Sequence, residues 1–161
     1  YYVDGRMKDP TPFLINGGIE MLRSFIKDID EEAVTHNAEI LKTQFAAEIN
    51  FLRNARYYYQ YGKLLITHAG FDSTAENWQD TSNQDFLWIR EHYLQPNQTG
   101  LINIFGHTPT RNMHKIDDIW ISPCQSYIGI DGGCAYGGQL NALLISEQGE
   151  ILETFVEHSD K

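Results

Sequence analysis

The 161-residue chain has few cysteines and no long hydrophobic run. Its two cysteines, Cys124 and Cys134, lack the paired spacing of a structural zinc site, and two are too few for a disulfide framework. No apolar stretch approaches the roughly 18 residues of a membrane-spanning helix, and the first residues show no basic-then-apolar signal pattern. These absences predict a cytoplasmic, reducing setting without a membrane partner.

Basic residues are also scarce, since 12 Lys and Arg face 22 Asp and Glu and the formal net charge is −10. Binding to nucleic acid or to an anionic membrane needs an excess of positive charge. We therefore expect no nucleic-acid partner. A hydrophobic fraction of 42% in a chain of this length predicts one domain with its own core.

Three short apolar runs stand out against this background. They are residues 64–66, 101–105 and 127–130, and each is followed by a polar side chain and glycine: His68, His107 and Asp131 respectively. Continuous runs of this length are typical of strands covered on both faces. Open α/β sheets place their ligand sites beyond the C-terminal ends of strands, which makes these three residues candidates for a site.

The remaining pattern predicts helices first and strands last. A short helix is expected after Gly18, and a continuous apolar stripe predicts one long helix from Val34 to Leu52, with Asp30 as its N-cap and Glu31 and Glu32 in its first turn. Ser82 is expected to cap a helix over residues 83–94. Further strands are predicted at 56–61, 119–121, 140–146 and 151–156, with a hairpin turn at Gln148-Gly149. The fold class is therefore α/β or α+β.

The six histidines divide by position. His68 and His107 end buried strands, where an imidazole either binds a divalent metal or caps the strand by hydrogen bonding, and the pattern alone leaves both options open. The other four are predicted to lie on the surface: His36, His92, His114 and His158.

Four motifs, in order, resemble the C-terminal motifs of bacterial phosphoprotein-phosphatase-type metallophosphoesterases. They are His68-Ala-Gly70, Trp88-Ile-Arg-Glu91, Gly106-His-Thr-Pro109 and Ile130-Asp-Gly-Gly-Cys-Ala-Tyr-Gly-Gly138. The resemblance implies a β-sandwich flanked by helices and two divalent metal ions, Mn²⁺ foremost with Fe or Zn as options, which activate water to hydrolyse a phosphoester.

The resemblance also assigns roles to five residues. It implies that His68 and His107 bind one metal and that Arg90 grips a phosphate oxygen, whereas the residues alone favour a helix-surface salt bridge for Arg90. Asp131 would orient a ligand histidine or the glycine-rich turn. Tyr136 would approach the substrate or simply pack.

The family's upstream motifs, Asp-x-His, Gly-Asp-x-x-Asp-Arg-Gly and Gly-Asn-His, do not occur in the 161 residues. We therefore expect residues 1–161 to be the C-terminal part of one metallophosphoesterase domain whose upstream half is missing, and the chain alone to be inactive. A serine/threonine protein phosphatase is the expected function. A dinucleoside tetraphosphate hydrolase of the same fold and a truncated, non-catalytic binding or regulatory module are the alternatives.

Overall fold

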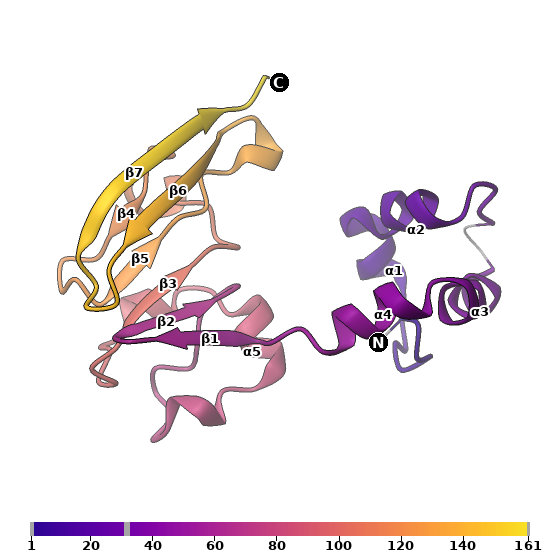
Figure 1. The fold of residues 1–161 in the computed structure, drawn as a ribbon, viewed down its shortest axis with the longest axis horizontal. Coiled ribbons are helices and arrows are strands. Elements are labelled where there is room, and N and C mark those ends of the chain that lie inside the picture. Colours follow the sequence, from indigo (N-terminus) through magenta and orange to yellow (C-terminus); the bar gives the residue numbers. More distant parts are fainter. Residues whose placement is uncertain (1, 31–32, 161) are drawn as a thin grey trace. The chain divides into compact units, whose positions relative to one another are not determined.

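The computed structural model describes residues 2–30 and 33–160 and has a mixed α and β fold, as predicted. The chain forms two compact units, Tyr1–Ala55 and Arg56–Lys161. The first is helical, and the second contains all the strands (Figure 1).

The helical unit is built around one small apolar core. Its helices are α1 (Thr11–Phe13), α2 (Ile19–Phe25), α3 (Val34–Gln44) and α4 (Ala46–Arg53), with a kinked helical stretch (Leu14–Gly18) between α1 and α2. The buried apolar residues are Tyr2, Leu22, Ala38, Leu41 and Ile49. The short helix predicted after Gly18 is confirmed as α2.

The single long helix predicted from Val34 to Leu52 is wrong, because the chain leaves the helical conformation at Phe45 (φ −124°, ψ 37°). Just before the break, the Thr43 hydroxyl donates to the Glu39 carbonyl at 2.8 Å, a bond that is associated with helix bending. The Phe45 ring then packs edge-on against Phe25, with centroids 4.9 Å apart. Beyond the break, Leu52 is 60% exposed, so the apolar stripe does not continue along one buried face.

The predicted cap of this helix is also wrong. α3 begins at Val34 with Ala33 in the cap position, where no side chain accepts a hydrogen bond. Asp30 contributes its backbone instead, since its carbonyl accepts from the Asn37 side chain at 2.7 Å. Glu31 and Glu32, predicted for the first turn, lie outside the described residues.

The second unit contains two sheets. The strands are β1 (Tyr58–Tyr61), β2 (Leu64–Thr67), β3 (Ile102–Phe105), β4 (Trp120–Ile121), β5 (Tyr127–Gly129), β6 (Gln139–Ile145) and β7 (Ile151–His158). The five-stranded sheet has the order β1-β2-β3-β5-β4, with β2, β3 and β5 parallel and the two edge strands antiparallel; β6 and β7 form a separate hairpin. All strands predicted from the sequence are present, and the turn at Gln148-Gly149 joins the last two.

Both faces of the three parallel strands are largely covered, which explains their mostly apolar runs, although Ile66 is exposed and Asn103 is polar. Neighbouring residues of a strand point to opposite faces. Leu64, Ile104 and Ile128 pack toward the β6–β7 hairpin, where Leu143, Ile145 and Ile151 meet them. The residues next to them in each strand, Leu65, Phe105 and Tyr127, pack with Phe86 and Met113 on the other face.

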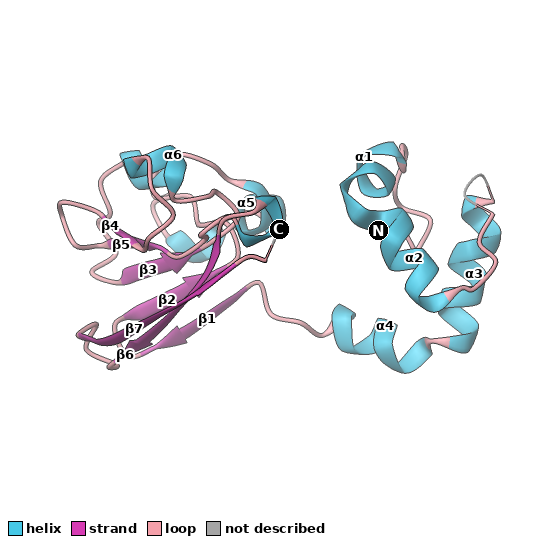
Figure 2. Ribbon diagram, turned by 90° about the horizontal axis from the view of Figure 1, so that it is seen from above, coloured by secondary structure: helices cyan, strands magenta, loops and turns pink. Residues whose placement is uncertain are grey.

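The helices of this unit lie on the face away from the hairpin. They are α5 (Asn83–Trp88) and α6 (Arg111–His114), and the unit also has single 3₁₀ turns at Trp78–Asp80, His92–Leu94 and Cys134–Tyr136. Figure 2 shows α5 and α6 above the five-stranded sheet and β6–β7 below it. In the described part of the chain, no helix combines the length and hydrophobicity needed to cross a bilayer.

Candidate functional site

The three parallel strands end at one edge of the sheet, and this brings the predicted site residues together. His68 follows β2, His107 lies two residues beyond β3, and Asp131 lies two residues beyond β5. The rings of His68 and His107 have centroids 5.1 Å apart. The Gly106 amide donates to the His68 carbonyl at 2.9 Å, so the two histidine-bearing turns are joined through their backbones.

His107 has an unusual backbone and an unusual ring environment. Its φ of 65° lies in the left-handed region, which is rarely occupied by residues other than glycine and is often found at functional sites. Its Nε2 is buried, and no hydrogen-bond partner for it occurs among residues 2–30 and 33–160. The Trp88 ring packs edge-on against the imidazole, with centroids 5.2 Å apart.

The surroundings of the His107 imidazole favour its neutral form. Burial lowers the pKa of His107, and the nearby charges of Arg90 and His68 lower it further, while Asp131 opposes them. Neutral imidazole has a free nitrogen lone pair, which is the form that binds metal ions. A buried ring nitrogen without a partner therefore has the chemistry of a ligand.

These residues fit part of a metal site. Two imidazoles that bind one ion at metal–nitrogen distances of about 2.1 Å place their ring centroids about 5 Å apart, close to the observed separation. His68 and His107 are the residues that would hold a metal ion. Within the described residues, however, no three His, Cys, Asp or Glu side chains gather closely enough to hold one.

Arg90 reaches the same edge from an irregular segment, not from the middle of a helix as predicted. The predicted cap is present, because Ser82 Oγ accepts from the Asp85 amide at 3.0 Å. The helix nevertheless ends at Trp88, since Ile89 is extended (ψ 140°) and Glu91 is left-handed (φ 61°).

The exposed Arg90 guanidinium contacts the residue next to His107. Its Nη1 donates to Thr108 Oγ at 3.3 Å. No carboxylate of the described residues pairs with it, so the salt-bridge interpretation gains no support there. A guanidinium at this edge has the paired donors that bind two oxygens of a phosphoryl group through parallel hydrogen bonds.

Asp131 holds the glycine-rich turn. Its Oδ1 accepts from the Gly133 amide at 2.8 Å, and its carbonyl accepts from the Thr110 amide at 2.8 Å. The turn closes tightly, because a Cβ on Gly138 would lie 2.1 Å from the Gly132 carbonyl oxygen. Tyr136 projects from this turn with 80% of its surface exposed, and its role at a substrate stays a prediction.

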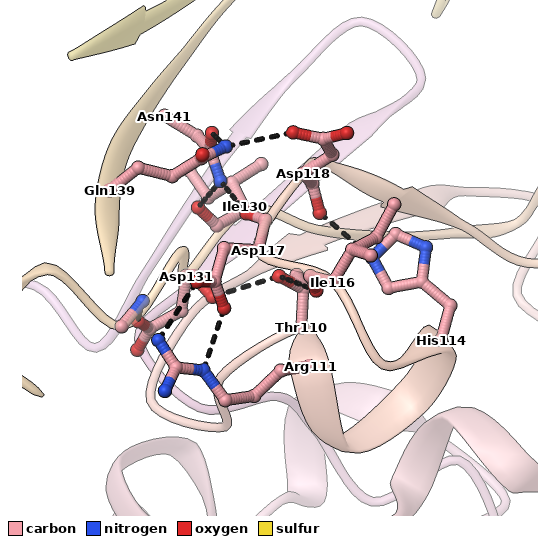
Figure 3. Close-up of polar contacts among 11 residues, drawn as sticks. Thr110, Arg111, His114, Ile116, Asp117, Asp118, Ile130, Asp131, Gln139 and Asn141 are labelled. Carbon is pink, nitrogen blue, oxygen red and sulfur yellow. Dashed lines mark hydrogen bonds and ion pairs between the residues drawn. The ribbon is translucent and has the colours of Figure 1, made fainter. Parts of the chain in front are cut away.

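A polar network that the sequence analysis missed supports this corner of the sheet (Figure 3). The Asn141 side chain donates to the Ile130 carbonyl at 3.1 Å and to the Asp117 carbonyl at 2.8 Å, and Gln139 donates to Asn141 and to Asp118. Arg111 pairs with Asp117 through two bonds of 2.6 and 2.9 Å. The network joins β6 to the end of β5, directly before Asp131. Only the tertiary fold assembles it, and no motif spacing indicates it.

The prediction that four histidines lie on the surface is wrong for His92. His36 and His158 are exposed, and His114 is half-buried, with its Nε2 3.0 Å from the Asp118 carbonyl. His92, in contrast, is only 3% exposed, and its Nε2 lies 3.0 Å from Asn103 Oδ1. Burial lowers the pKa of His92 from 6.5 to about 4. Its position beside the polar Glu91 gave no sign of this burial.

Comparison of the chain with family models, with curated proteins and with solved structures gives no match. The resemblance to metallophosphoesterases therefore rests on the four sequence motifs alone.

Proposed function

We propose that this chain carries one side of the catalytic site of a metal-dependent phosphoesterase. The observation that supports it most is the pair of imidazoles, His68 and His107, at the ends of β2 and β3. The Arg90 guanidinium lies beside this pair, because it donates a hydrogen bond to Thr108, the residue after His107. A metal-ligand pair next to a phosphate-binding arginine is what phosphoester hydrolysis requires. Divalent metal ions in such sites activate water and neutralise phosphoryl charge.

The chain's own residues have separate tasks in this proposal. His68 and His107 hold one metal ion, Mn²⁺ foremost and Fe or Zn as options, through neutral nitrogens. Arg90 binds the phosphoryl oxygens and stabilises their charge in the transition state. Asp131 fixes the glycine-rich turn, from which Tyr136 approaches the substrate.

The substrate is a phosphorylated protein, and the protein acts as a cytoplasmic serine/threonine phosphatase. A dinucleoside tetraphosphate would present the same phosphoryl chemistry to Arg90. A non-catalytic module is favoured by one observation, namely that no three metal-binding side chains gather among the described residues. In the phosphoesterase proposal, the remaining metal ligands come from a segment that carries the upstream motifs.

Paramagnetic broadening by Mn²⁺ tests the site directly. In a ¹H–¹³C spectrum of the full chain, Mn²⁺ should broaden the ring signals of His68 and His107 before those of His36 and His114. His68→Ala or His107→Ala should abolish this selectivity, because one imidazole alone is a weak ligand. His36→Ala is the matched control and should leave the pattern unchanged. Equal broadening of all exposed histidines would contradict the assignment.

Displacement of inorganic phosphate tests the substrate class. With Mn²⁺ present, a phosphoserine peptide should displace phosphate from Arg90 more strongly than a dinucleoside tetraphosphate does. The reverse order would favour the tetraphosphate hydrolase. A chain that binds none of the three with Mn²⁺ would favour the non-catalytic module.

A further inference from the structure

The buried ring of His92 lies where the three segments carrying the candidate site residues meet. It packs edge-on against Phe105 of β3, with centroids 4.5 Å apart. A Cβ on Gly70, in the turn after His68, would lie 2.4 Å from the imidazole Cε1. His92 itself follows Arg90 by two residues. One side chain thus touches the His68 turn, the strand that leads to His107 and the segment that carries Arg90.

The hydrogen bonds of Asn103 determine which nitrogen of His92 carries the proton. The Asn103 amide group donates to the Leu65 carbonyl at 2.9 Å and to Thr67 Oγ at 3.0 Å, so its Oδ1 is the acceptor toward His92. The Nε2 of His92 must therefore be the donor. Since Thr67 directly precedes His68, a continuous chain of bonds runs from His92 through Asn103 to the His68 turn.

Arg90 is held from both sides by this arrangement. On the N-terminal side, the Ala69 amide donates to the Phe86 carbonyl at 2.9 Å and fixes the end of α5 to the His68 turn. On the C-terminal side, His92 is fixed to Asn103. The partly buried bond from Arg90 to Thr108 is long at 3.3 Å and contributes little by itself. The position of the guanidinium therefore depends on the two attachments.

We propose that His92 is a positioning residue, which sets the distance of the Arg90 guanidinium from His68 and His107 without touching the substrate. This inference rests on the proposed function for its phosphate ligand. The Gly70 turn supports the same role, because only a residue without a side chain leaves space for the ring. A misplacement of about one ångström in a group that positions the substrate is enough to impair catalysis strongly.

The test compares replacements that keep or remove the donor toward Asn103. Gln at position 92 can place an amide N–H near the position of Nε2, whereas Leu cannot. Two signals are measured on the full chain: the affinity for inorganic phosphate with Mn²⁺ present, and the nuclear Overhauser contact between Arg90 and Thr108 without it, because Mn²⁺ would broaden the signals near His107. The matched control is His114→Leu, at a half-buried histidine whose ring Nε2 lies 3.0 Å from the Asp118 carbonyl.

We expect His92→Leu to lower phosphate affinity about tenfold and to remove the Arg90–Thr108 contact, because the charged hydrogen bonds to phosphate depend on geometry. His92→Gln should keep both, and His114→Leu should change neither. If His92→Leu does not fold, the pair His92→Leu with Asn103→Leu carries the same expectation, since it removes both partners of the His92–Asn103 bond together.

A His92→Leu chain that is folded and keeps both the phosphate affinity and the Arg90–Thr108 contact would overturn the inference. Loss of both signals in His92→Gln as well would also overturn it, because the donor would then not be the cause. If the wild-type chain binds no phosphate, the proposed function fails instead. The positioning role of His92 is then tested only by whether His92→Leu loses the Arg90–Thr108 contact and His92→Gln keeps it.

Discussion

At the scale of single residues, Arg90 shows how position separates a binding role from a structural one. The side chain is exposed, and within residues 2–30 and 33–160 its hydrogen bond is to Thr108. A structural arginine would be expected to stabilise the fold through carboxylates or packing, whereas a phosphate-binding one needs open donors. The two roles therefore predict different effects of substitution.

We predict that Arg90→Ala lowers phosphate affinity about tenfold or more, because a hydrogen bond to a charged group contributes about 1.5–3 kcal/mol. Wherever turnover is measurable, kcat/KM should fall by about 10²-fold. Arg90→Lys should recover only part of the phosphate affinity and of kcat/KM, since an ammonium lacks the paired donors of a guanidinium. The melting temperature should stay close to wild type. Unchanged phosphate binding with a lowered melting temperature would make Arg90 structural.

The burial of His92 leads to a separate prediction about how the stability of the fold depends on pH. Its pKa is about 4 in the folded chain and 6.5 as a free group, so between these values the unfolded state binds a proton that the folded state does not. The free energy of unfolding should therefore fall as pH drops from about 6.5 to about 4, by about 3 kcal/mol. Below that window the contribution is fully lost.

Urea denaturation at several pH values measures this effect. In His92→Gln, the free energy of unfolding should no longer show the decrease with falling pH that His92 causes. His114→Gln should still show this decrease. The carboxylates contribute equally to all three chains, so the comparison isolates His92. If the free energy of unfolding changed with pH in the same way in wild type and His92→Gln, His92 would not be buried as a neutral ring.

At the scale of elements, the strands could be predicted and the ends of the helices could not. The runs at 64–66, 101–105 and 127–130 are apolar because each strand faces the hairpin on one side and Phe86 or Met113 on the other. This double coverage leaves a pattern in the local sequence. The convergence of His68 and His107 follows from the parallel order of β2 and β3.

The predicted helix to Leu94 failed because its local spacing was compatible with two structures. Phe86, Ile89 and Tyr93 fit one helical face, yet the chain turns at Glu91 so that His92 reaches Asn103. That contact is tertiary and outweighs helix propensity. The Gln139–Asn141 network was unpredictable for the same reason, since its partners Asp117 and Ile130 come from other parts of the chain.

The glycine-rich turn gives a prediction at this scale. Gly138→Ala should destabilise the chain by about 1–3 kcal/mol, because the new Cβ would meet the Gly132 carbonyl at 2.1 Å and rigid backbone must move. Gly100→Ala is the control, since space around it is open and only its φ of 72° is unfavourable, at about 1 kcal/mol. Urea midpoints measure both. Equal losses would show that the turn is loosely packed.

At the scale of the whole molecule, the question is how much of a metal site the chain provides. The sheet edge presents two imidazoles, one of them with a buried nitrogen that lacks a described partner. Dinuclear sites need several ligands and a bridging carboxylate, and the described residues bring no third ligand to this pair. Two histidines on a rigid edge can select the position of an ion without holding it tightly.

We therefore predict that the 161-residue chain binds Mn²⁺ weakly and without a tight stoichiometric step. Isothermal titration calorimetry measures this, and His68→Ala should remove the weak heat signal that His36→Ala leaves intact. Affinity should fall as pH drops, because protons compete with the metal for imidazole nitrogens. Two tight, stoichiometric sites on the isolated chain would contradict the prediction, because essential ligands would then be present in these residues. Weak binding that is confined to His68 and His107 would instead show that the chain supplies one side of a site whose remaining ligands come from another segment.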